Sequence, residues 1–401
     1  GDHALLIDIH RAELSQLNRN TEIVMDVKKP LPLLGGISPE VFMKRYWHKK
    51  PLLVRQAIPG FSPLLARSEL FELAGREEVE SRLVALERRR GKEHWTLQRG
   101  PFARRALPAL KTPEWTLLVQ GVDLHSDALH DLMNRFRFIP DARLDDLMIS
   151  YASDGGGVGP HFDNYDVFLL QAHGQRRWRI GRQHDLSLKP NMPVKILANF
   201  EPEQEFVLEP GDMLYLPPHY AHDGVAVGGD CMTYSIGFRS PKAGELAQEL
   251  LQRLAEDAIE VVGDDFYRDP GQAAVATPAA LPAELGRFAR QALQQALQDP
   301  LALTRALGET LSEPKAHVWF ETGDKPKGRW GVALDRRTRM LYDEQHVYIN
   351  GESYRAGGRD AVLMRRLADQ HCLSAAEVVR ASKAARELLQ AWCEDGWAHA
   401  C

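Results

Sequence analysis

The sequence is short of cysteine, of long apolar runs and of any large charge excess. Its four cysteines show no Cys-x-x-Cys spacing, which argues against a zinc site and against a disulfide framework. No apolar run approaches the roughly 18 residues of a membrane-spanning helix, and no signal-peptide pattern opens the chain. We therefore expect a cytoplasmic protein without a membrane partner. A formal net charge of -5 argues against a chain built mainly to coat nucleic acid.

The remaining composition is typical of a globular protein, with 44% hydrophobic and 26% charged residues. A chain of 401 residues is expected to hold two or three domains with ample core. Residues 1–24 precede Met25 and are set apart as an N-terminal extension, either natural or added. The rest divides into three zones, at residues 25–240, 241–305 and 306–401.

The first zone, residues 25–240, is rich in short β-type runs separated by glycine and proline. The runs lie near residues 51–54, 115–119, 147–151, 167–170, 177–180, 205–208, 213–216 and 232–236. Many short strands with turn signals between them predict a barrel or jelly roll. Helical stretches are expected beside it near residues 39–47, 67–76 and 125–136.

The second zone, residues 241–305, changes to helical periodicity. Helices are expected at about 243–260 and 282–298, where apolar side chains recur at spacings of three and four. The stripes consist of Leu246, Leu250, Leu251 and Leu254 on the first helix and Leu285, Phe288, Leu293 and Leu297 on the second. Such stripes need a partner surface, so we expect a homodimer interface here. The alternative is that both helices cap the open end of the barrel.

The third zone, residues 306–401, mixes helices with a β-hairpin. Two strands flank an Asn350-Gly351 turn, and helices are expected at about 359–371, 374–382 and 384–396. Helices with a β-wing predict a winged-helix-like domain, a fold that often binds DNA. Residues 301–401 carry 15 Lys and Arg against 14 Asp and Glu, so the basic footprint of DNA binding is missing. A protein-contact role is expected instead.

The strongest chemical signal is His161-Phe162-Asp163, with His222 sixty-one residues after His161. In an extended strand, residues i and i+2 point to the same face, so His161 and Asp163 would converge. A second histidine from a distant strand would complete a 2-His-1-carboxylate triad, which is diagnostic of non-haem Fe(II) oxygenases. The glycine-rich segment at 155–160 leads the chain into this motif.

Two histidines could supply the second imidazole, His219 and His222. Pro217 and Pro218 interrupt ladder hydrogen bonding, so the chain should leave its strand there and re-enter a few residues later. His222 fits the re-entry position, whereas His219, next to the prolines, fits the rim. We therefore expect His222 to be the ligand.

An iron oxygenase that uses 2-oxoglutarate also needs a cation for the far carboxylate of that cosubstrate. Arginine suits this best because its planar fork gives two parallel hydrogen bonds. Arg176, Arg177 and Arg179 lie on one predicted strand, where only alternate residues face inward. We expect Arg176 to be the clamp, with either Ser150 or Ser235 as a hydroxyl partner.

Three residues near the ligand motif are candidates for substrate binding. Asp154 stands beside the glycine run, and Tyr165 and Asp166 follow the ligand pair. An acidic group would suit an arginine substrate, although Asp154 also fits a plain turn residue.

Taken together, these motifs resemble the JmjC-type Fe(II)/2-oxoglutarate oxygenases and, more narrowly, the bacterial ribosomal oxygenases. The resemblance covers residues 25 to about 401, and the matching segments are Tyr46 to Leu53, Gly155 to Asp163, Asn164 to Phe168, Gln175 to Gly181 and Gly211 to His222.

The resemblance implies an α+β architecture with a double-stranded β-helix (cupin-like JmjC jelly roll), a helical dimerisation segment and a C-terminal winged-helix domain. It also implies iron ligands at His161, Asp163 and His222, and a 2-oxoglutarate contact at Arg176. O2 is the second cosubstrate. The expected reaction is hydroxylation of an arginine β-carbon on large-subunit ribosomal protein sixteen.

Other functions remain open at this point. A histidine hydroxylase or a demethylase would use the same chemistry on another side chain. A cupin-type binding protein would share the barrel but leave Arg176 unexplained. A transcription regulator with a barrel sensor would explain the winged-helix-like tail, but not the complete triad or the neutral charge of the tail.

Overall fold

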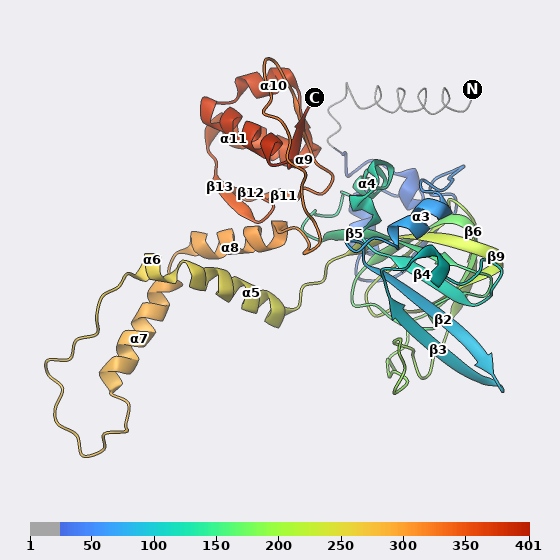
Figure 1. The fold of residues 1–401 in the computed structure, drawn as a ribbon, viewed down its shortest axis with the longest axis horizontal. Coiled ribbons are helices and arrows are strands. Elements are labelled where there is room, and N and C mark those ends of the chain that lie inside the picture. The colour runs from blue at the N-terminus through green and yellow to red at the C-terminus, as the bar shows by residue number, and fades with distance from the viewer. Residues whose placement is uncertain (1–24) are drawn as a thin grey trace.

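The computed structural model describes residues 25–401, so the extension expected at residues 1–24 lies outside the described part of the chain. Figure 1 shows a β-rich body, a helical arm that leaves the body, and a C-terminal unit of helices and short strands over the body. The three follow one another along the chain in the predicted order.

The body is built on a nine-stranded antiparallel sheet with the order β1-β8-β6-β9-β5-β4-β2-β3, in which β7 also pairs with β6. The strands are β1 (Leu52–Val54), β2 (Ser81–Arg89), β3 (Lys92–Arg99), β4 (Trp115–Val119), β5 (Leu144–Ala152), β6 (Val167–Gly181), β7 (Gln204–Leu208), β8 (Met213–Leu216) and β9 (Ala221–Phe238).

Two long strands, β6 and β9, tie the body together. They pair from Val167↔Gly237 at one end to Gly181↔Ala221 at the other, with two register shifts between Gln171 and Gln175. Such irregularities bend a strand and let one chain serve both halves of a rolled sheet. Together with the surrounding helices, this is the α+β jelly-roll architecture predicted from the sequence.

The sheet has one face on the main core and one face on the functional site. Along β5, Ile149 and Tyr151 are fully buried in the core, where Tyr151 packs against Trp115. Ser150 alternates with them and therefore points to the other face. Because one strand serves both faces, packing of the core fixes the position of the site.

Three short helices complete the body: α2 (Pro39–Arg45), α3 (Arg67–Leu73) and α4 (Asp127–Asn134). Ser38 and Ser126 cap α2 and α4 by accepting hydrogen bonds from backbone N–H groups in the first turn. Phe42 of α2 is fully buried, and its ring contacts Phe168 and Tyr215 on the sheet. These elements match the predicted helical stretches.

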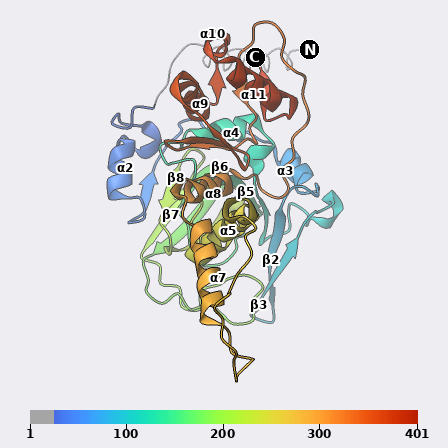
Figure 2. The ribbon, with the colours of Figure 1, turned by 90° about the vertical axis from the view of Figure 1, so that its left-hand side faces the viewer.

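The arm contains α5 (Ala243–Glu256), α6 (Ala258–Val262), α7 (Ala283–Ala296) and α8 (Pro300–Ser312). The first predicted helix is divided at Asp257, and α8 was not predicted as a separate helix. Neither α5 nor α7 has a buried residue. Figure 1 shows the arm running away from the barrel, and in Figure 2 the arm points toward the viewer, so its helices do not cap the barrel end.

The C-terminal unit has its own core around Trp392 and Leu389. It combines α9 (Gly358–Gln370), α10 (Ala375–Arg380) and α11 (Lys383–Glu394) with two three-stranded sheets. The sheets are β14 (Cys372–Leu373), β10 (Val332–Leu334) and β15 (Ala398–Ala400), and β11 (Met340–Tyr342), β12 (His346–Ile349) and β13 (Glu352–Arg355). Asn350 and Gly351 both have positive φ, as the predicted hairpin turn requires.

One prominent element was not predicted, the β2–β3 hairpin. β3 is polar and largely exposed, and β2 has a consecutive apolar run from Leu83 to Leu86 followed by three exposed residues, so the hairpin lacks the sustained apolar alternation that marks a strand with one buried face. Within residues 25–401, no helix combines the length and the apolarity needed to cross a membrane.

Candidate functional site

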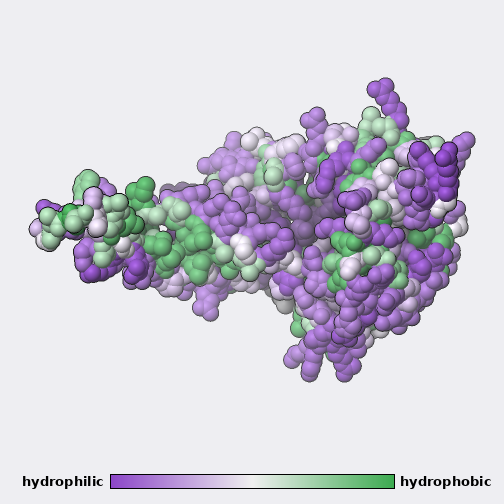
Figure 3. Space-filling model, turned by 90° about the horizontal axis from the view of Figure 1, so that it is seen from below, coloured by the Kyte–Doolittle hydropathy of each residue, from purple (hydrophilic) through white to green (hydrophobic). Residues whose placement is uncertain are grey.

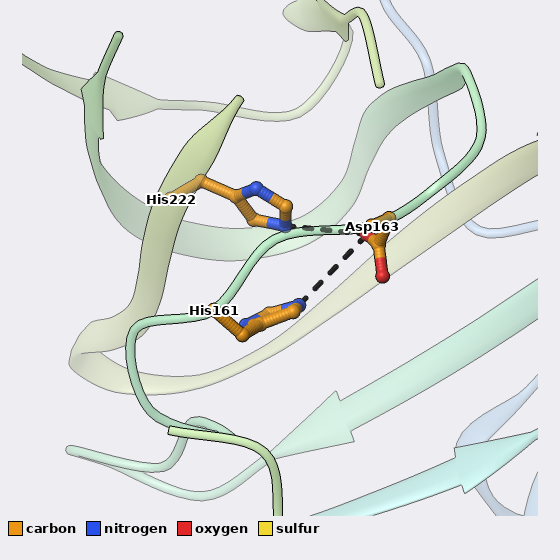
Figure 4. Close-up of side chains that lie close together, drawn as sticks. All are labelled: His161, Asp163 and His222. Atoms are coloured by element: carbon orange, nitrogen blue, oxygen red, sulfur yellow. Dashed lines mark ion pairs between the residues drawn. The ribbon is translucent and has the colours of Figure 1, made fainter. Parts of the chain in front are cut away.

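Three side chains meet at one end of the barrel: His161, Asp163 and His222. His161 forms an isolated β-bridge with His222, the second residue of β9, and their backbones exchange hydrogen bonds of 2.9 Å and 2.8 Å. The possible ligand atoms of the three side chains all lie within 4.8 Å of one another. Figure 4 shows both imidazoles turned toward the carboxylate of Asp163.

The local backbone differs from the expected single strand. Only His161 pairs, whereas Asp163 lies in the loop between that bridge and β6. The backbone N–H of His219 donates to the Asp163 carbonyl at 2.7 Å, which holds the loop in place. The convergence of the two side chains thus comes from a fixed loop and not from the two-residue repeat of a strand.

Hydrogen bonds to backbone carbonyl groups set the tautomer of both histidines. Nδ1 of His161 lies 2.8 Å from the Gly159 carbonyl oxygen, and Nδ1 of His222 lies 2.8 Å from the Tyr220 carbonyl oxygen. Because a carbonyl oxygen only accepts, each Nδ1 carries a hydrogen and each Nε2 presents a lone pair. The Nε2 atoms lie 3.9 Å (His161) and 3.5 Å (His222) from Oδ2 of Asp163.

The electrostatics of the site favour metal-binding protonation states. Burial lowers the pKa of His161, and the neighbouring His222 lowers it further. Burial opposes ionisation of Asp163, but its contacts with His222 and His161 outweigh burial and lower the pKa of Asp163 to about 2. Two neutral imidazoles and one carboxylate are the donor set of non-haem Fe(II) sites, so these residues fit that metal.

The other candidate histidine, His219, lies outside the triad. It is exposed, adopts a positive φ of 63°, and its Nε2 lies 2.8 Å from Oδ1 of Asn164. Its side chain thus fastens the rim of the loop. The structure thus places His222, the histidine that the sequence favoured, beside His161 and Asp163.

Arg176 of β6 is a buried cation on the wall next to the triad. Only 3% of its surface is exposed. Nη1 donates to Ser150 Oγ at 3.3 Å, Nη2 donates to the Gly224 carbonyl at 3.0 Å, and Nε has no partner among the described residues. No carboxylate of residues 25–401 forms an ion pair with it. A buried guanidinium with an unpartnered N–H fits an anionic ligand.

Trp178 links this cation to the metal site, and sequence reasoning missed it. Its ring lies 5.1 Å from the Arg176 guanidinium and 5.8 Å from the His222 ring. A Cβ at Gly224 would lie 2.6 Å from both Arg176 Nε and the Trp178 ring, so only glycine fits there. The signal available in the sequence was the two-residue spacing that puts Arg176 and Trp178 on one face.

The structure distinguishes between the two candidate serines, because only one of them contacts Arg176. Ser150 contacts Arg176 directly. Ser235 is also buried, but it pairs with Met148 and Leu169 further along the sheet, and no hydrogen bond joins it to Arg176 in the described chain.

Of the three candidate substrate contacts, only Tyr165 reaches the triad. Tyr165 is 39% exposed, and its hydroxyl group lies close enough to Asp163 to lower the pKa of that carboxyl. Burial of the hydroxyl group and the charge of Asp163 raise the pKa of Tyr165. Tyr165 therefore combines a contact at the metal site with a solvent-facing surface.

Asp154 and Asp166 have structural contacts instead. Asp154 is exposed and accepts a hydrogen bond from Gly229 N at 3.1 Å, as expected of a turn residue. Asp166 is fully buried, accepts from the Tyr215 hydroxyl group and lies 2.8 Å from His48 Nε2. Its carboxylate therefore anchors the segment after α2 and has no surface for a substrate.

Comparisons with known proteins agree with this geometry. A family model described as JmjC domain matches residues 131–246, and one described as ROXA-like winged helix matches residues 295–399. The ribosomal protein uL16 3-hydroxylase of Escherichia coli K12 is 35% identical over 339 residues, which cover 80% of this chain and 86% of the relative.

Solved structures of YcfD from E. coli share the fold over most of both chains. One matches with a TM-score of 0.76 and 31% identity, covering 90% of this chain and 98% of the other. Another, described as a ribosomal oxygenase in complex with cobalt and 2-oxoglutarate, matches with a TM-score of 0.72 and 30% identity, covering 90% and 97%. This chain belongs to the family of bacterial JmjC-domain ribosomal oxygenases.

Proposed function

We propose that this protein is an Fe(II)- and 2-oxoglutarate-dependent hydroxylase that acts on the β-carbon of an arginine in ribosomal protein uL16. The observation that carries the proposal is the pairing of a His161–Asp163–His222 triad with the buried, carboxylate-free guanidinium of Arg176. The E. coli relative is named as a uL16 3-hydroxylase, which supports the same substrate. A cytoplasmic location is part of the proposal, because a ribosomal substrate is met there.

Each part of the site has a separate task in this proposal. Fe(II) and 2-oxoglutarate, when bound, would supply the oxidising chemistry together with O2. His161, Asp163 and His222 would hold the metal through three ligands on one side, which leaves the opposite side open. Arg176 would bind the far carboxylate of 2-oxoglutarate, with Ser150 as the hydroxyl partner. Trp178 packs between the two groups and excludes water from the space separating them.

Tyr165 is the residue best placed to meet the polypeptide substrate. Tyr165 is partly exposed, and its hydroxyl group lies near Asp163. An aromatic face at that position can pack against the aliphatic part of an arginine side chain and hold its β-carbon near the metal. Neither Asp154 nor Asp166 is retained in this role.

The substrate assignment is tested with purified protein, Fe(II), 2-oxoglutarate and a peptide spanning an arginine-containing segment of uL16. Mass spectrometry should find one added oxygen atom on a single arginine. In cells that lack the protein, that modification should vanish from large ribosomal subunits. Turnover of histidine-containing ribosomal peptides, with uL16 left unmodified, would replace this substrate with the histidine alternative.

The ligand assignment is tested by alanine substitution. His161→Ala, Asp163→Ala and His222→Ala should each abolish peptide hydroxylation and weaken metal binding, because each removes one of three protein ligands. His219→Ala is the matched control and should retain most activity. Loss of metal binding in His219→Ala, with His222→Ala unaffected, would contradict the assignment.

The proposed assembly is a homodimer formed through the arm, with domain limits at 25–240, 241–305 and 306–401. The arm exposes large apolar side chains, including Leu251 at 56% and Leu293 at 61% of their surface. Figure 3 shows hydrophobic residues gathered along it. A second copy of the same arm would cover both stripes in one isologous bundle.

A further inference from the structure

A strong concentration of positive charge lies in residues 81–111, named here the basic ribbon. It comprises the β2–β3 hairpin, the 3-10 helix Arg104–Ala106 and the segment that runs on to Lys111. It carries nine Lys and Arg against two Glu, a formal net charge of +7, whereas the whole chain carries -5. Opposite charges are therefore segregated into different parts of the surface.

Most of these cations are not neutralised within the protein. Arg88 pairs with Glu93 and Glu114, and Arg89 pairs with Glu87. Within the described chain no carboxylate forms an ion pair with any of the other seven, which are Arg82, Arg90, Lys92, Arg99, Arg104, Arg105 and Lys111. Six of those seven are exposed, Arg82 being half-buried. Unpaired, exposed cations of one sign repel one another and favour a polyanion.

The shape of the ribbon suits an extended partner. Its strands pair from Arg82↔Arg99 to Arg89↔Lys92, and Arg90 and Gly91 form the turn with φ of 51° and 75°. β3 lies at the free edge of the sheet. Figure 1 shows the hairpin projecting from the body. Two-stranded β-ribbons are one of the elements with which proteins enter nucleic-acid grooves.

The ribbon is also joined to the loop that carries the metal ligands. Arg88, at 3.1 Å from Glu114, reaches the glycine run, because a Cβ at Gly155 would lie 3.3 Å from the Glu114 side chain. A Cβ at Gly159, two residues before the first ligand, would lie 3.4 Å from the Trp95 ring. Whatever the ribbon binds is therefore held beside the mouth of the site.

We propose that the basic ribbon binds the phosphate backbone of RNA, so that the enzyme meets its protein substrate next to RNA. The meeting of enzyme and substrate next to RNA rests on the proposed ribosomal substrate, whereas RNA binding by the ribbon rests on charge and shape alone. A +7 surface attracts the phosphate backbone of the RNA that surrounds a protein bound in a ribosome. His94 and the half-buried Trp95 add aromatic faces for base stacking.

The test compares three proteins in the binding of a fluorescein-labelled RNA stem-loop by fluorescence anisotropy over a series of salt concentrations. Wild type should bind with an affinity that falls steeply with salt. Arg90→Gln with Lys92→Gln should bind more weakly, and the slope of log affinity against log salt should fall by about two, roughly one for each cation. Lys325→Gln with Lys327→Gln removes the same charge from exposed positions in the C-terminal unit and should bind like wild type.

Three outcomes would overturn the proposal. They are absence of binding at low salt, an equal loss in both double variants, and competition by poly-L-glutamate as strong as that by unlabelled RNA of equal charge. Hydroxylation of the isolated uL16 peptide is measured in the same three proteins and should be unchanged. If the wild-type protein hydroxylates the peptide but does not bind RNA, only this inference is removed. If it binds RNA but does not hydroxylate the peptide, only the proposed function is removed.

Discussion

At the residue scale, the site depends on which of three neighbouring arginines points inward. Arg176 is 3% exposed and lies on the same face as Trp178, while Arg179 points the other way and pairs with Asp223. Strand alternation places Arg176 on one face and Arg177 with Arg179 on the other, and the contact with Ser150 identifies Arg176 as the inward one.

Arg176→Ala should therefore raise the KM for 2-oxoglutarate strongly and leave metal binding nearly intact. Loss of a charge-assisted contact in a buried site costs about 1.5–3 kcal/mol, or roughly ten- to a hundredfold in affinity. Arg177→Ala, one position along the strand, is the control and should keep its KM. Steady-state kinetics and metal titration check both variants. Unchanged 2-oxoglutarate kinetics in Arg176→Ala would rule out this clamp.

Gly224→Ala should damage the same clamp from the backbone side. The added Cβ would lie 2.6 Å from Arg176 Nε and from the Trp178 ring, so one of them must move. We expect a raised KM for 2-oxoglutarate with a lower thermal unfolding temperature. Gly237→Ala, on the same strand, places its Cβ 3.6 Å from the nearest atom and should behave like wild type. A normal KM for 2-oxoglutarate in Gly224→Ala would show that Arg176 or Trp178 can move without loss of 2-oxoglutarate binding.

The clustering of His161, Asp163 and His222 could be predicted from the sequence, whereas the residues that support the cluster could not. His161, Asp163 and His222 carry a recognisable spacing and unusual flanking glycines. Trp178 and Gly224 are common residue types whose roles arise only when β6 pairs with β9 in register, Trp178 opposite Gly224. Asp166 was misplaced for the same reason, since its burial depends on Tyr215 from another strand.

At the element scale, strands with one apolar face were predicted well and polar ones were not. β4 and β8 have the predicted bounds, and the C-terminal hairpin carries the expected Asn-Gly turn. The β2–β3 hairpin is largely exposed along β3 and around its turn at Arg90-Gly91, so neither its turn nor its periodicity stood out. Its charge, not its hydrophobicity, is its distinguishing feature.

A second element-scale feature is the joint between barrel and C-terminal unit. Lys315 lies 2.9 Å from Asp145 Oδ1 and 4.0 Å from Asp146 Oδ2, next to the buried Asp123. Burial raises the pKa of Asp123 from its ordinary value of 3.8 to about 7, and the charge of Asp146 adds to this. The folded protein therefore holds this proton more tightly than the unfolded chain does.

Asp123 should accordingly make stability fall as the pH rises from about 4 to about 7, because over this range the unfolded chain releases the proton while the folded state still holds it. Asp123→Asn removes this titration and keeps an acceptor for the Leu147 N–H, which lies 2.9 Å from Oδ1. Relative to wild type, the variant should gain stability as the pH rises through that range. Thermal unfolding at several pH values checks this. A difference that does not vary with pH would contradict the raised pKa.

At the scale of the whole molecule, the net charge does not reveal how charge is distributed along the chain. A net charge of -5 argued against a chain built mainly to coat nucleic acid, yet residues 81–111 alone carry +7. The rest of the chain must therefore be strongly acidic. Such segregation lets one molecule attract a polyanion at one surface and a basic polypeptide at another. It also explains why whole-chain composition could not locate the basic ribbon.

The oligomeric state is the other property of the whole molecule to be tested, because the arm exposes apolar surface that would remain in water in a monomer. Leu251→Glu with Leu293→Glu should convert a dimer into a monomer, since two charges would be buried without partners on each side of a two-fold interface. Light scattering should give twice the 45.2 kDa subunit mass for wild type and the subunit mass for this variant. Val362→Glu with Val379→Glu changes equally exposed residues of the C-terminal unit, at 64% and 58%, and should leave the dimer intact. A monomeric wild type at micromolar concentration would remove the dimer, and with it any fixed orientation of two active sites.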